Sequence, residues 1–515
     1  MRTKVIDSPL GGINRRVGYQ NQPPYTLYDS TNFWPLDFVT GRAVLATRPP
    51  LNTFTSPGGT VNMLCRVNGQ VSGSLLQSMV CATGSDIYWW NGSAWVAATG
   101  AQASSAPTGI PVYAASFLQE TYIPQVSAKP IVFNLTTGAA ATIVETAGTA
   151  PTDCRMFIVW QGALWAAGQL ANPHILFGSR TGNAKDWLAS VPLSDEGGAF
   201  STSGENEGVL RGPITALFAH TADTMIVSTL EGLVAFRGHP RRGGVAEDIA
   251  TSTYILGQGA WTRGPGGVAY FLTRQGLMSL GTEDGAIPTP ISGGKIPQEL
   301  AAVPYNYNAP NISLEYDSGF NGIHITVRGG GSPQAWWFDF SAGGFSRMTF
   351  DDYPFVLMEF PPLAVALRSA VLYGGAGYGG IGRMDTIDVL AEEFTASATI
   401  GPVRLGTDPR SQAKVLQARV SFTHTGSAIA GTMKFSADAD SEGAISRLTE
   451  GVEQYSVALD DLVANNSICY PKATGGALAI QVSHGAGARL AVDQITLNLE
   501  EAGTIKSKPH RPEII

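Results

Sequence analysis

Short runs of apolar residues, separated by glycine- and asparagine-containing turns, recur along most of the chain. One example has two apolar runs, Met156–Trp160 and Ala163–Ala167, on either side of the turn Gln161-Gly162. A third run, His174–Gly178, follows after a loop. Runs of this length between turn residues are typical of β-strands. This stretch therefore predicts a small antiparallel sheet.

The same pattern is found before and after this stretch. Asn91-Gly92 separates Ile87–Trp90 from Ala94–Val96, and an Asn-Gly pair is a strong hairpin signal because both residues tolerate a positive φ. Another set of strands begins with Ala216–Phe218 and Thr224–Ser228. Six or seven such units of roughly 30 to 45 residues predict a β-propeller, since stacked blades close a ring without long free edges. A pair of β-sandwiches is the alternative, with less regular turns.

Both ends of the chain differ from this repeat. The N-terminal residues are polar and rich in turns, whereas the C-terminal runs alternate apolar and polar residues, as half-buried strands require. We predict an all-β chain with an extended N-terminal arm. Its parts are the arm and a first strand pair over residues 1–50, a β-propeller of six or seven blades over 51–390, a C-terminal β-sandwich over 391–502 and a basic tail over 503–515.

The composition favours a component of an assembly. Charged residues make up 14% of the 515 residues and hydrophobic residues 44%. A low charge content is natural for a surface that neighbouring subunits cover. The net charge of −8 provides no basic field for tight binding of nucleic acid, although an acidic protein can line a channel through which DNA slides.

The cysteines and the first residues bear on the compartment. Cys65, Cys81, Cys154 and Cys469 are widely spaced in or beside apolar runs, so we expect buried free thiols. The first ten residues lack the apolar core of a signal peptide, and no apolar run reaches the roughly 18 residues that span a membrane. We therefore expect a chain that is made in the cytoplasm and has no membrane segment of its own.

The search for catalytic motifs gives no candidate. The sequence contains no G-x-S-x-G, H-E-x-x-H or P-loop motif, and its seven histidines are isolated from one another. His324 alternates with apolar neighbours, which predicts that it points across the sheet from the core. We predict that the chain is not an enzyme and has no catalytic residue, no cofactor and no metal.

Two groups of carboxylates could instead hold a metal or carry out catalysis. Asp438, Asp440 and Glu442 have the spacing of a calcium loop, but Thr449 stands where the last ligand is needed, so a solvated hairpin turn is favoured. A propeller glycosidase needs two carboxylates at one site. Asp195, Glu196, Glu205, Glu207 and Glu231 could supply them, but nothing in the sequence picks out two of these residues. The polar run over residues 191–212 is more simply a long loop between blades.

Arginines cluster in one segment and in the arm. Arginine is enriched in protein interfaces, and no aromatic stacking partners accompany these residues, so an interface is favoured over a phosphate contact. The candidate interface residues are Arg15, Arg16, Trp34, Arg237, Arg241, Arg242 and Arg263.

The order of these features resembles the tail-nozzle or tail-hub proteins of short-tailed bacteriophages, also called tail tubular or tail accessory proteins. The resemblance covers nearly the whole chain and is one of pattern. It is carried by the segments NFWPLDFVTGRAVLATRPPL, CRMFIVWQGALWAAG, NPHILFGSRTGNAKDW, ITALFAHTADTMIVSTLEGLVAF, LEYDSGFNGIHITVRGGGSPQAWWFDFSAGGFSRM and, near the C-terminus, LQARVSFTHTG, KFSADAD and RLAVDQITLNLE.

The resemblance implies a structural role in a virion, without catalytic residues. Proteins of this family form a ring, usually of six copies, below the head-to-tail adaptor ring, with the propellers outside and a channel for the genomic DNA inside. It implies contacts with tail fibre, spike or needle proteins, assembly in the host cytoplasm, and DNA that passes without specific binding. The chain is shorter than the larger nozzle proteins, and the tail type stays open.

A propeller that binds or degrades glycans of the host surface is the alternative function. A glycan-binding module would need an exposed aromatic patch, for which Trp89, Trp90, Trp336 and Trp337 are the candidates.

Overall fold

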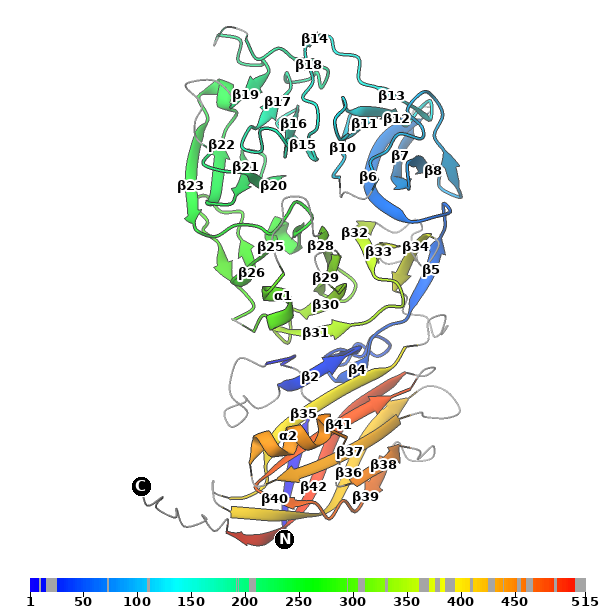
Figure 1. Cartoon of the computed structure of the whole chain (residues 1–515), viewed down its shortest axis with the longest axis vertical. Helices are drawn as coiled ribbons and strands as arrows, with labels where there is room; N and C mark the ends of the chain where they lie inside the picture. Colours follow the sequence, from blue (N-terminus) through cyan, green and yellow to red (C-terminus); the bar gives the residue numbers. More distant parts are fainter. Residues whose placement is uncertain are drawn as a thin grey trace, which may run out of the picture. The chain divides into compact units, whose positions relative to one another are not determined.

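The structure is a computed structural model of the chain, and it is all-β, with a β-propeller, as the sequence predicts (Figure 1). It describes residues 1–8, 11–14, 26–71, 74–108, 112–190, 192, 194–202, 210–293, 295–303, 311–328, 332–360, 370–375, 380–384, 394–407, 411–424, 431–438, 440–451, 455–459, 466–485 and 489–504.

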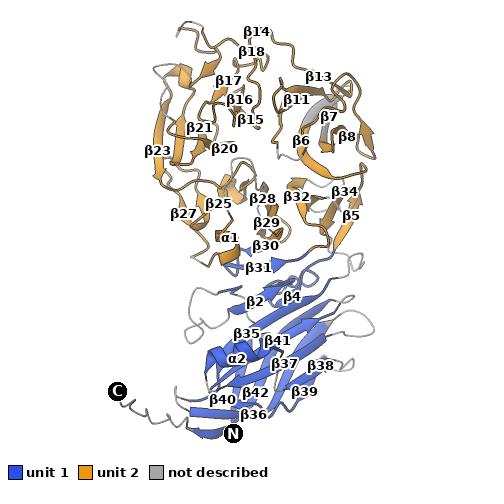
Figure 2. Ribbon diagram, in the orientation of Figure 1, with its two compact units in different colours: residues 1–50, 336–349, 385–515 blue, residues 51–335, 350–384 orange. Residues whose placement is uncertain are grey.

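The chain divides into two compact units (Figure 2). Unit 1 consists of residues 1–50, 336–349 and 385–515, and unit 2 of residues 51–335 and 350–384. The chain therefore starts in unit 1 and forms most of unit 2. It returns to unit 1 over residues 336–349, completes unit 2 with residues 350–384 and ends in unit 1. The residues predicted as an arm and the residues predicted as a C-terminal sandwich belong to the same unit.

Unit 2 contains six four-stranded antiparallel sheets, which are its complete blades. The first three follow the chain. They are β6–β9 (Val61–Val71, Ser74–Thr83, Asp86–Trp90, Trp95–Ala97), β10–β13 (Ala115–Phe117, Glu120–Ile123, Ile131–Asn134, Ala139–Thr142) and β15, β16, β17 and β19 (Met156–Trp160, Ala163–Ala167, Phe177–Gly178, Phe200–Ser201). Between the second and third blades, β14 (Ala147–Gly148) pairs in parallel with β18 (Asp186–Trp187).

The next blades continue in the same manner. They are β20–β23 (Ile214–Ala219, Thr224–Thr229, Gly232–Arg237, Val245–Thr251), β24–β27 (Trp261–Arg263, Ala269–Thr273, Gly276–Leu280, Thr289–Pro290) and β32–β34 (Pro354–Phe360, Ala370–Gly375, Gly380–Met384) with β5 (Leu51–Thr55). The last blade takes its outer strand from the start of the unit, because β34 pairs with β5. This pairing joins the two ends of the ring, so that it closes without a free edge.

A hairpin lies between the fifth and the last of these blades. β28 (Asn311–Asp317) and β29 (Gly322–Arg328) pair in antiparallel fashion, and β28 packs against β24 on one side and β32 on the other. The strand β30 (Gln334–Asp339) follows β29 as its neighbour in the same sheet, and its residues from Trp336 onward belong to unit 1. The described part of unit 2 thus has six complete blades and this hairpin in the ring, in line with the predicted six or seven units. A short helix, α1 (Gln298–Ala301), precedes this hairpin in the chain.

Local turn chemistry explains the blades that the sequence predicted best. β15 and β16 have the predicted bounds, and Gln161 (φ 48°) and Gly162 (φ 70°) form the turn between them. Two successive positive φ values match the right-handed twist of a hairpin. All five residues of β16 are buried, because neighbouring blades cover both faces of a propeller sheet. The alternation expected for a half-buried strand is absent here for that reason.

Unit 1 is built from two sheets. The first consists of β1 (Arg2–Asp7), β3 (Phe33–Trp34), β4 (Leu45–Thr47), β36 (Ser411–His424), β39 (Asn466–Cys469), β40 (Thr474–Gly475) and β42 (Leu490–Thr504). The second contains β2 (Leu27–Thr31), β31 (Gly344–Met348), β35 (Ala396–Arg404), β37 (Gly431–Asp438), β38 (Tyr455–Leu459) and β41 (Ala477–His484).

The N-terminal strands are integral to this sandwich. β1 pairs along its whole length with β42, and β2 pairs with β35. Leu27, Phe33 and Leu45 join the same buried cluster as Val415 and Leu497. The apolar side chains of these N-terminal strands pack against strands from the other end of the chain. The segment predicted as an extended arm therefore contains strands of the sandwich.

The predicted hairpin turn at Asp438–Glu442 is wrong, because a helix begins there. Helix α2 (Ser441–Thr449) starts after Asp440, whose carboxylate accepts a hydrogen bond from the Gly443 amide at 2.7 Å. The buried residues Ala444, Ile445 and Leu448 recur at helical spacing on its inner face. Asp438 is engaged in an ion pair with Arg447 at 2.7 Å. The carboxylates that resemble a calcium loop therefore act as a helix cap and as an ion-pair partner.

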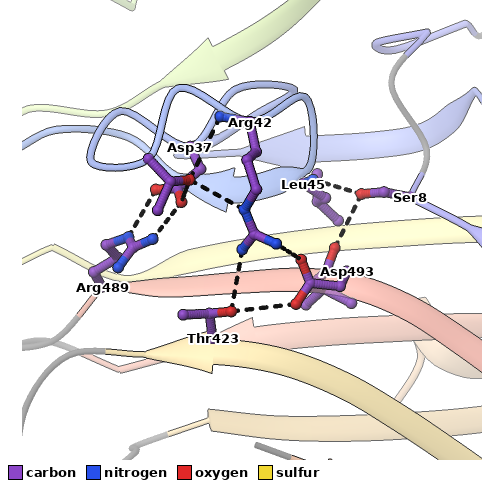
Figure 3. Close-up of polar contacts among 9 residues, drawn as sticks. Ser8, Asp37, Arg42, Leu45, Thr423, Arg489 and Asp493 are labelled. Carbon is purple, nitrogen blue, oxygen red and sulfur yellow. Dashed lines mark hydrogen bonds and ion pairs between the residues drawn. The ribbon is translucent and has the colours of Figure 1, made fainter.

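A polar network joins the two ends of the chain in unit 1 (Figure 3). Ser8 accepts a hydrogen bond from the Leu45 amide at 2.5 Å and donates one to the Val492 carbonyl at 3.0 Å. Arg42 forms an ion pair with Asp493 at 3.0 Å. These contacts hold the segment of residues 37–45 against the start of β42.

Candidate functional site

The pocket that stands out in unit 2 lies between the fourth blade, β20–β23, and the fifth, β24–β27. Its volume is about 350 Å³. The segments that follow β20, precede β21, end β22 and follow β26 supply its polar lining: His220, Thr221, Asp223, Thr224, Arg237, Thr282, Glu283 and Asp284. Strand ends and turns place polar side chains at a blade junction because the strands themselves are buried.

His220 links the two blades beneath this pocket. Its Nε2 lies 2.6 Å from the Gly281 carbonyl oxygen, and a carbonyl can only accept, so Nε2 carries the hydrogen. Burial lowers the pKa of His220, the bond to Gly281 opposes this, and the nearby Arg263 lowers it further. The ring is thus neutral at neutral pH. It stabilises the junction and is not placed as an exposed acid or base.

The charges at the pocket mouth are mostly negative. Arg237 pairs with Glu247 at 2.8 Å and with Asp284 at 2.5 Å. Asp223 and Glu283 are exposed, and Asp223 accepts a long hydrogen bond of 3.4 Å from Gln161 on the third blade. Exposed carboxylates are hydrated and interact weakly with their neighbours. The pocket can accept hydrogen bonds from a small polar ligand, and its three carboxylates outnumber the Arg237 guanidinium.

The structure brings two of the predicted arginines to this pocket and separates the others. Arg263 donates to the Ala219 and His220 carbonyls, beside the pocket that Arg237 lines. Arg241 donates to the Ala199 carbonyl at 2.9 Å and to the Ala189 carbonyl, so it holds local backbone. Arg242 is exposed. Arg15 and Arg16 lie outside the described residues.

Trp34 and the candidate tryptophans Trp90, Trp336 and Trp337 are buried, whereas Trp89 is half-buried. Trp34 is fully buried in unit 1 and stacks on Trp337, with ring centroids 4.4 Å apart. It therefore offers no surface to another subunit. Trp90 and Trp336 are also buried, so these residues do not form the exposed aromatic patch that a glycan-binding module would need.

The described acidic residues that were candidates for glycosidase chemistry have separate surroundings. Asp195 is held by Arg180 through two hydrogen bonds of 2.9 and 3.1 Å. Glu231 is exposed in the turn before β22, and Glu205 and Glu207 lie outside the described residues. In the part of the chain that the structure describes, no three His, Cys, Asp or Glu side chains are placed to hold a metal ion.

A buried polar cluster was missed by the sequence reasoning. His324 lies on β29 and is completely buried. Its Nε2 lies 3.2 Å from an Asp317 carboxylate oxygen, and its Nδ1 lies 2.6 Å from the hydroxyl of Tyr373 on the last blade. The prediction that His324 points away from the core is wrong, because a propeller sheet is covered on both faces. A histidine within a buried apolar strand was the signal that could have found it.

A carboxyl group with a strongly raised pKa lies near this cluster. Glu315 on β28 accepts a hydrogen bond from the Thr262 hydroxyl at 3.2 Å. Burial raises the pKa of Glu315 to about 8, and the negative charge of Glu359 adds to the shift. Glu315 is therefore largely protonated at neutral pH and bridges the innermost strands of the ring as a neutral group.

No family model and no curated protein matches the chain. Among solved structures, the extracellular domain of BT4673 from B. thetaiotaomicron is 12% identical with a TM-score of 0.42, over 74% of this chain and 44% of that one. The extracellular domain of BT3049 from B. thetaiotaomicron is 11% identical with a TM-score of 0.39, over 74% and 46%.

A third structure, YCF48 bound to D1 peptide, is 10% identical with a TM-score of 0.39, over 65% of this chain and 96% of that one. The match spans less than half of each B. thetaiotaomicron chain. In the described part of the chain, no helix has the length and apolar character needed to cross a membrane.

Proposed function

We propose that this chain is a structural subunit of a bacteriophage virion. In this proposal six copies form a ring, the tail nozzle or hub, below the head-to-tail adaptor, and the ring encloses the channel through which the DNA leaves. The resemblance of sequence pattern over nearly the whole chain supports the proposal. So does the low content of charged residues, 14%, since extensive subunit contacts favour a weakly charged surface.

The observation that carries the proposal is the insertion of the propeller into the sandwich. Residues 1–50, 336–349 and 385–515 build one unit, and the two segments of unit 2, residues 51–335 and 350–384, are each connected to it at both ends. A ring subunit needs a rigid body for contacts with its neighbours and a separate module that can meet other tail proteins. The sandwich, which contains the strands from both ends of the chain, suits the first role, and the propeller suits the second.

The experiment that tests the proposal is the mass of the purified chain in solution, measured by light scattering over a range of concentrations. The measurement is made alone and with the head-to-tail adaptor encoded in the same genome. We expect a species of six subunits, or a ring that forms on the adaptor, together with no salt-sensitive affinity for DNA. A chain that stays monomeric at all concentrations and ignores the adaptor would overturn the proposal.

A binding role for the propeller is the second candidate, and the pocket between the fourth and fifth blades favours it. Its described lining is polar and carries Asp223, Glu283 and Asp284, but no Trp, Tyr or Phe on which a sugar ring could stack. A screen of small polar ligands and of glycans, read by thermal shift, tests it. Binding that is lost in Asp223→Asn/Asp284→Asn would support this role, and a lack of any hit would count against it.

A further inference from the structure

One transverse row of the first sheet in unit 1 runs from one edge of the sheet to the other. Val5 on β1 pairs with Thr496 on β42, Thr496 pairs with Arg419 on β36, and Arg419 pairs with Ile468 on β39. Residues of one such row project from the same face of a sheet. The row therefore has an aliphatic side chain at each end and polar side chains between them.

The two end residues are exposed although they are apolar. Val5 is 49% exposed and Ile468 is 51% exposed, and Tyr470, two residues further along the same face, is 58% exposed. Among the described residues, β1 has β42 as its strand partner and β39 has β36, so each has one free edge. A free edge with exposed apolar residues is a template for pairing with another chain.

The strand directions make these two edges complementary. β1, β42, β36 and β39 are antiparallel in succession, so β1 and β39 run in opposite directions. A second copy that continues the sheet in the same orientation brings its β39 beside β1 of the first copy. The new pair is then antiparallel as well, and the alternation of directions is preserved across the junction.

We propose that β39 of one copy pairs with β1 of the next copy, so that this sheet runs on from subunit to subunit. This inference rests on the proposed ring and specifies its contact. Pairing of two different edges is a heterologous contact, which repeats around a ring until the rotation closes it. Contacts of this kind add backbone hydrogen bonds and place Val5 against the apolar residues Ile468 and Tyr470 of the neighbour.

The size of this contact sets what it can do. β39 has only four residues, so the strand pair covers much less than the roughly 1,200–2,000 Å² of a stable interface. The pairing therefore fixes the orientation and register of neighbouring copies, while other surfaces or the adaptor supply the remaining affinity. We expect its loss to lower the ring population rather than to unfold the subunit.

The test uses engineered cysteine pairs in the full chain. Ile468→Cys is combined with Thr3→Cys, Val5→Cys or Asp7→Cys, which occupy alternate positions on one face of β1 and so cover three registers. Within one copy, Val5 and Ile468 are three strand spacings apart, about 14 Å, too far for a disulfide. A disulfide between these positions must therefore join two copies. The native thiols give little background, since Cys81, Cys154 and Cys469 are buried and Cys65 is half-buried.

Under mild oxidation at a concentration where the wild-type ring forms, we expect at least one pair to give a ladder of covalent oligomers that ends at the ring size. The single variants should give no ladder. Ile468→Cys with Val245→Cys is the matched control, because Val245 is 63% exposed but lies on the fourth blade of unit 2. In light scattering, Val5→Glu and Ile468→Glu should each reduce the ring population, whereas Val245→Glu should not.

The outcomes separate this inference from the proposed function. A wild-type ring with no ladder from any of the three pairs would overturn the strand pairing and leave the ring itself intact. A covalent dimer from the Val5→Cys single variant would show a two-fold pairing of β1 with β1, which also overturns it. A wild-type chain that never assembles, alone or on the adaptor, would instead refute the proposed function.

Discussion

Arg489 and Asp37, which are 452 residues apart in the sequence, form an ion pair in the interior of unit 1 (Figure 3). The Arg489 Nε donates to one Asp37 oxygen at 2.7 Å, and a terminal guanidinium nitrogen donates to the other. The Asp37 side chain is fully buried and that of Arg489 is 5% exposed. Thr40 and the Val39 amide also donate to Asp37, so the carboxylate is well satisfied. The pair fixes the turn before β4 against the start of β42.

Removing only the arginine should therefore destabilise unit 1. We expect Arg489→Met to lower its free energy of unfolding by about 3–5 kcal/mol, because Asp37 is left as an uncompensated buried charge. The double variant Asp37→Leu/Arg489→Met should recover most of this loss. Arg42→Met is the matched control, since the Arg42–Asp493 pair is partly exposed and worth about 1 kcal/mol or less. Urea unfolding followed by hydrogen exchange of the unit 1 strands measures each change.

The same pair should make unit 1 sensitive to acid. Burial alone would raise the pKa of Asp37, but the hydrogen bonds from Arg489 and Thr40 outweigh it and hold the pKa below the usual 3.8. A lowered pKa adds stability that is present above pH 3.8 and is lost as the pH falls through the folded-state value. Urea midpoints between pH 7 and pH 2.5 should show this acid loss in the wild type. If Asp37→Leu/Arg489→Met loses stability equally over that range, other carboxylates cause it.

Glu315 should give unit 2 the opposite dependence. Its pKa in the folded protein, about 8, lies above the usual value of 4.5 for a glutamate, so the folded state holds a proton that the unfolded state has released. Stability is therefore lost as the pH rises from about 4.5 to about 8. In Glu315→Gln this slope should be reduced, and the variant should exceed the wild type in stability at pH 8.5. Thermal unfolding of both proteins at pH 5, 7 and 8.5 is the measurement, and parallel curves would contradict the assignment.

The strands and turns of the blades were predictable because their information is local. β15, β16 and the turn at Gln161-Gly162 follow from apolar runs and turn residues within a dozen positions. The same reasoning does not predict α2, because the spacing of Asp438 and Asp440 resembles a calcium loop, although Ala444, Ile445 and Leu448 recur at helical spacing.

Long-range partners could not be predicted from these patterns. The pairing of β1 with β42 joins residues almost 500 positions apart, and strand periodicity shows which face is apolar but not what covers it. The pocket also depends on long-range contacts. Arg237 belongs to a cluster of arginines that is visible in the sequence, but Asp284, with which it pairs, comes from the next blade. His220 shows the limit as well, since its bond to Gly281 depends on how two blades meet.

Trp34 lies in the core of unit 1, although the sequence suggested that it is an interface residue. Its ring stacks on Trp337 with an interplanar angle of 13°, and both residues are fully buried. Trp34→Ala should therefore lower the stability of unit 1 by about 3–5 kcal/mol, through lost burial and the cavity that remains. Arg242→Ala, at an exposed candidate, should change stability by less than about 0.5 kcal/mol. Denaturation at a concentration where the chain is monomeric separates the two roles. A Trp34→Ala protein that is as stable as the wild type as a monomer, but fails to assemble, would restore the interface interpretation.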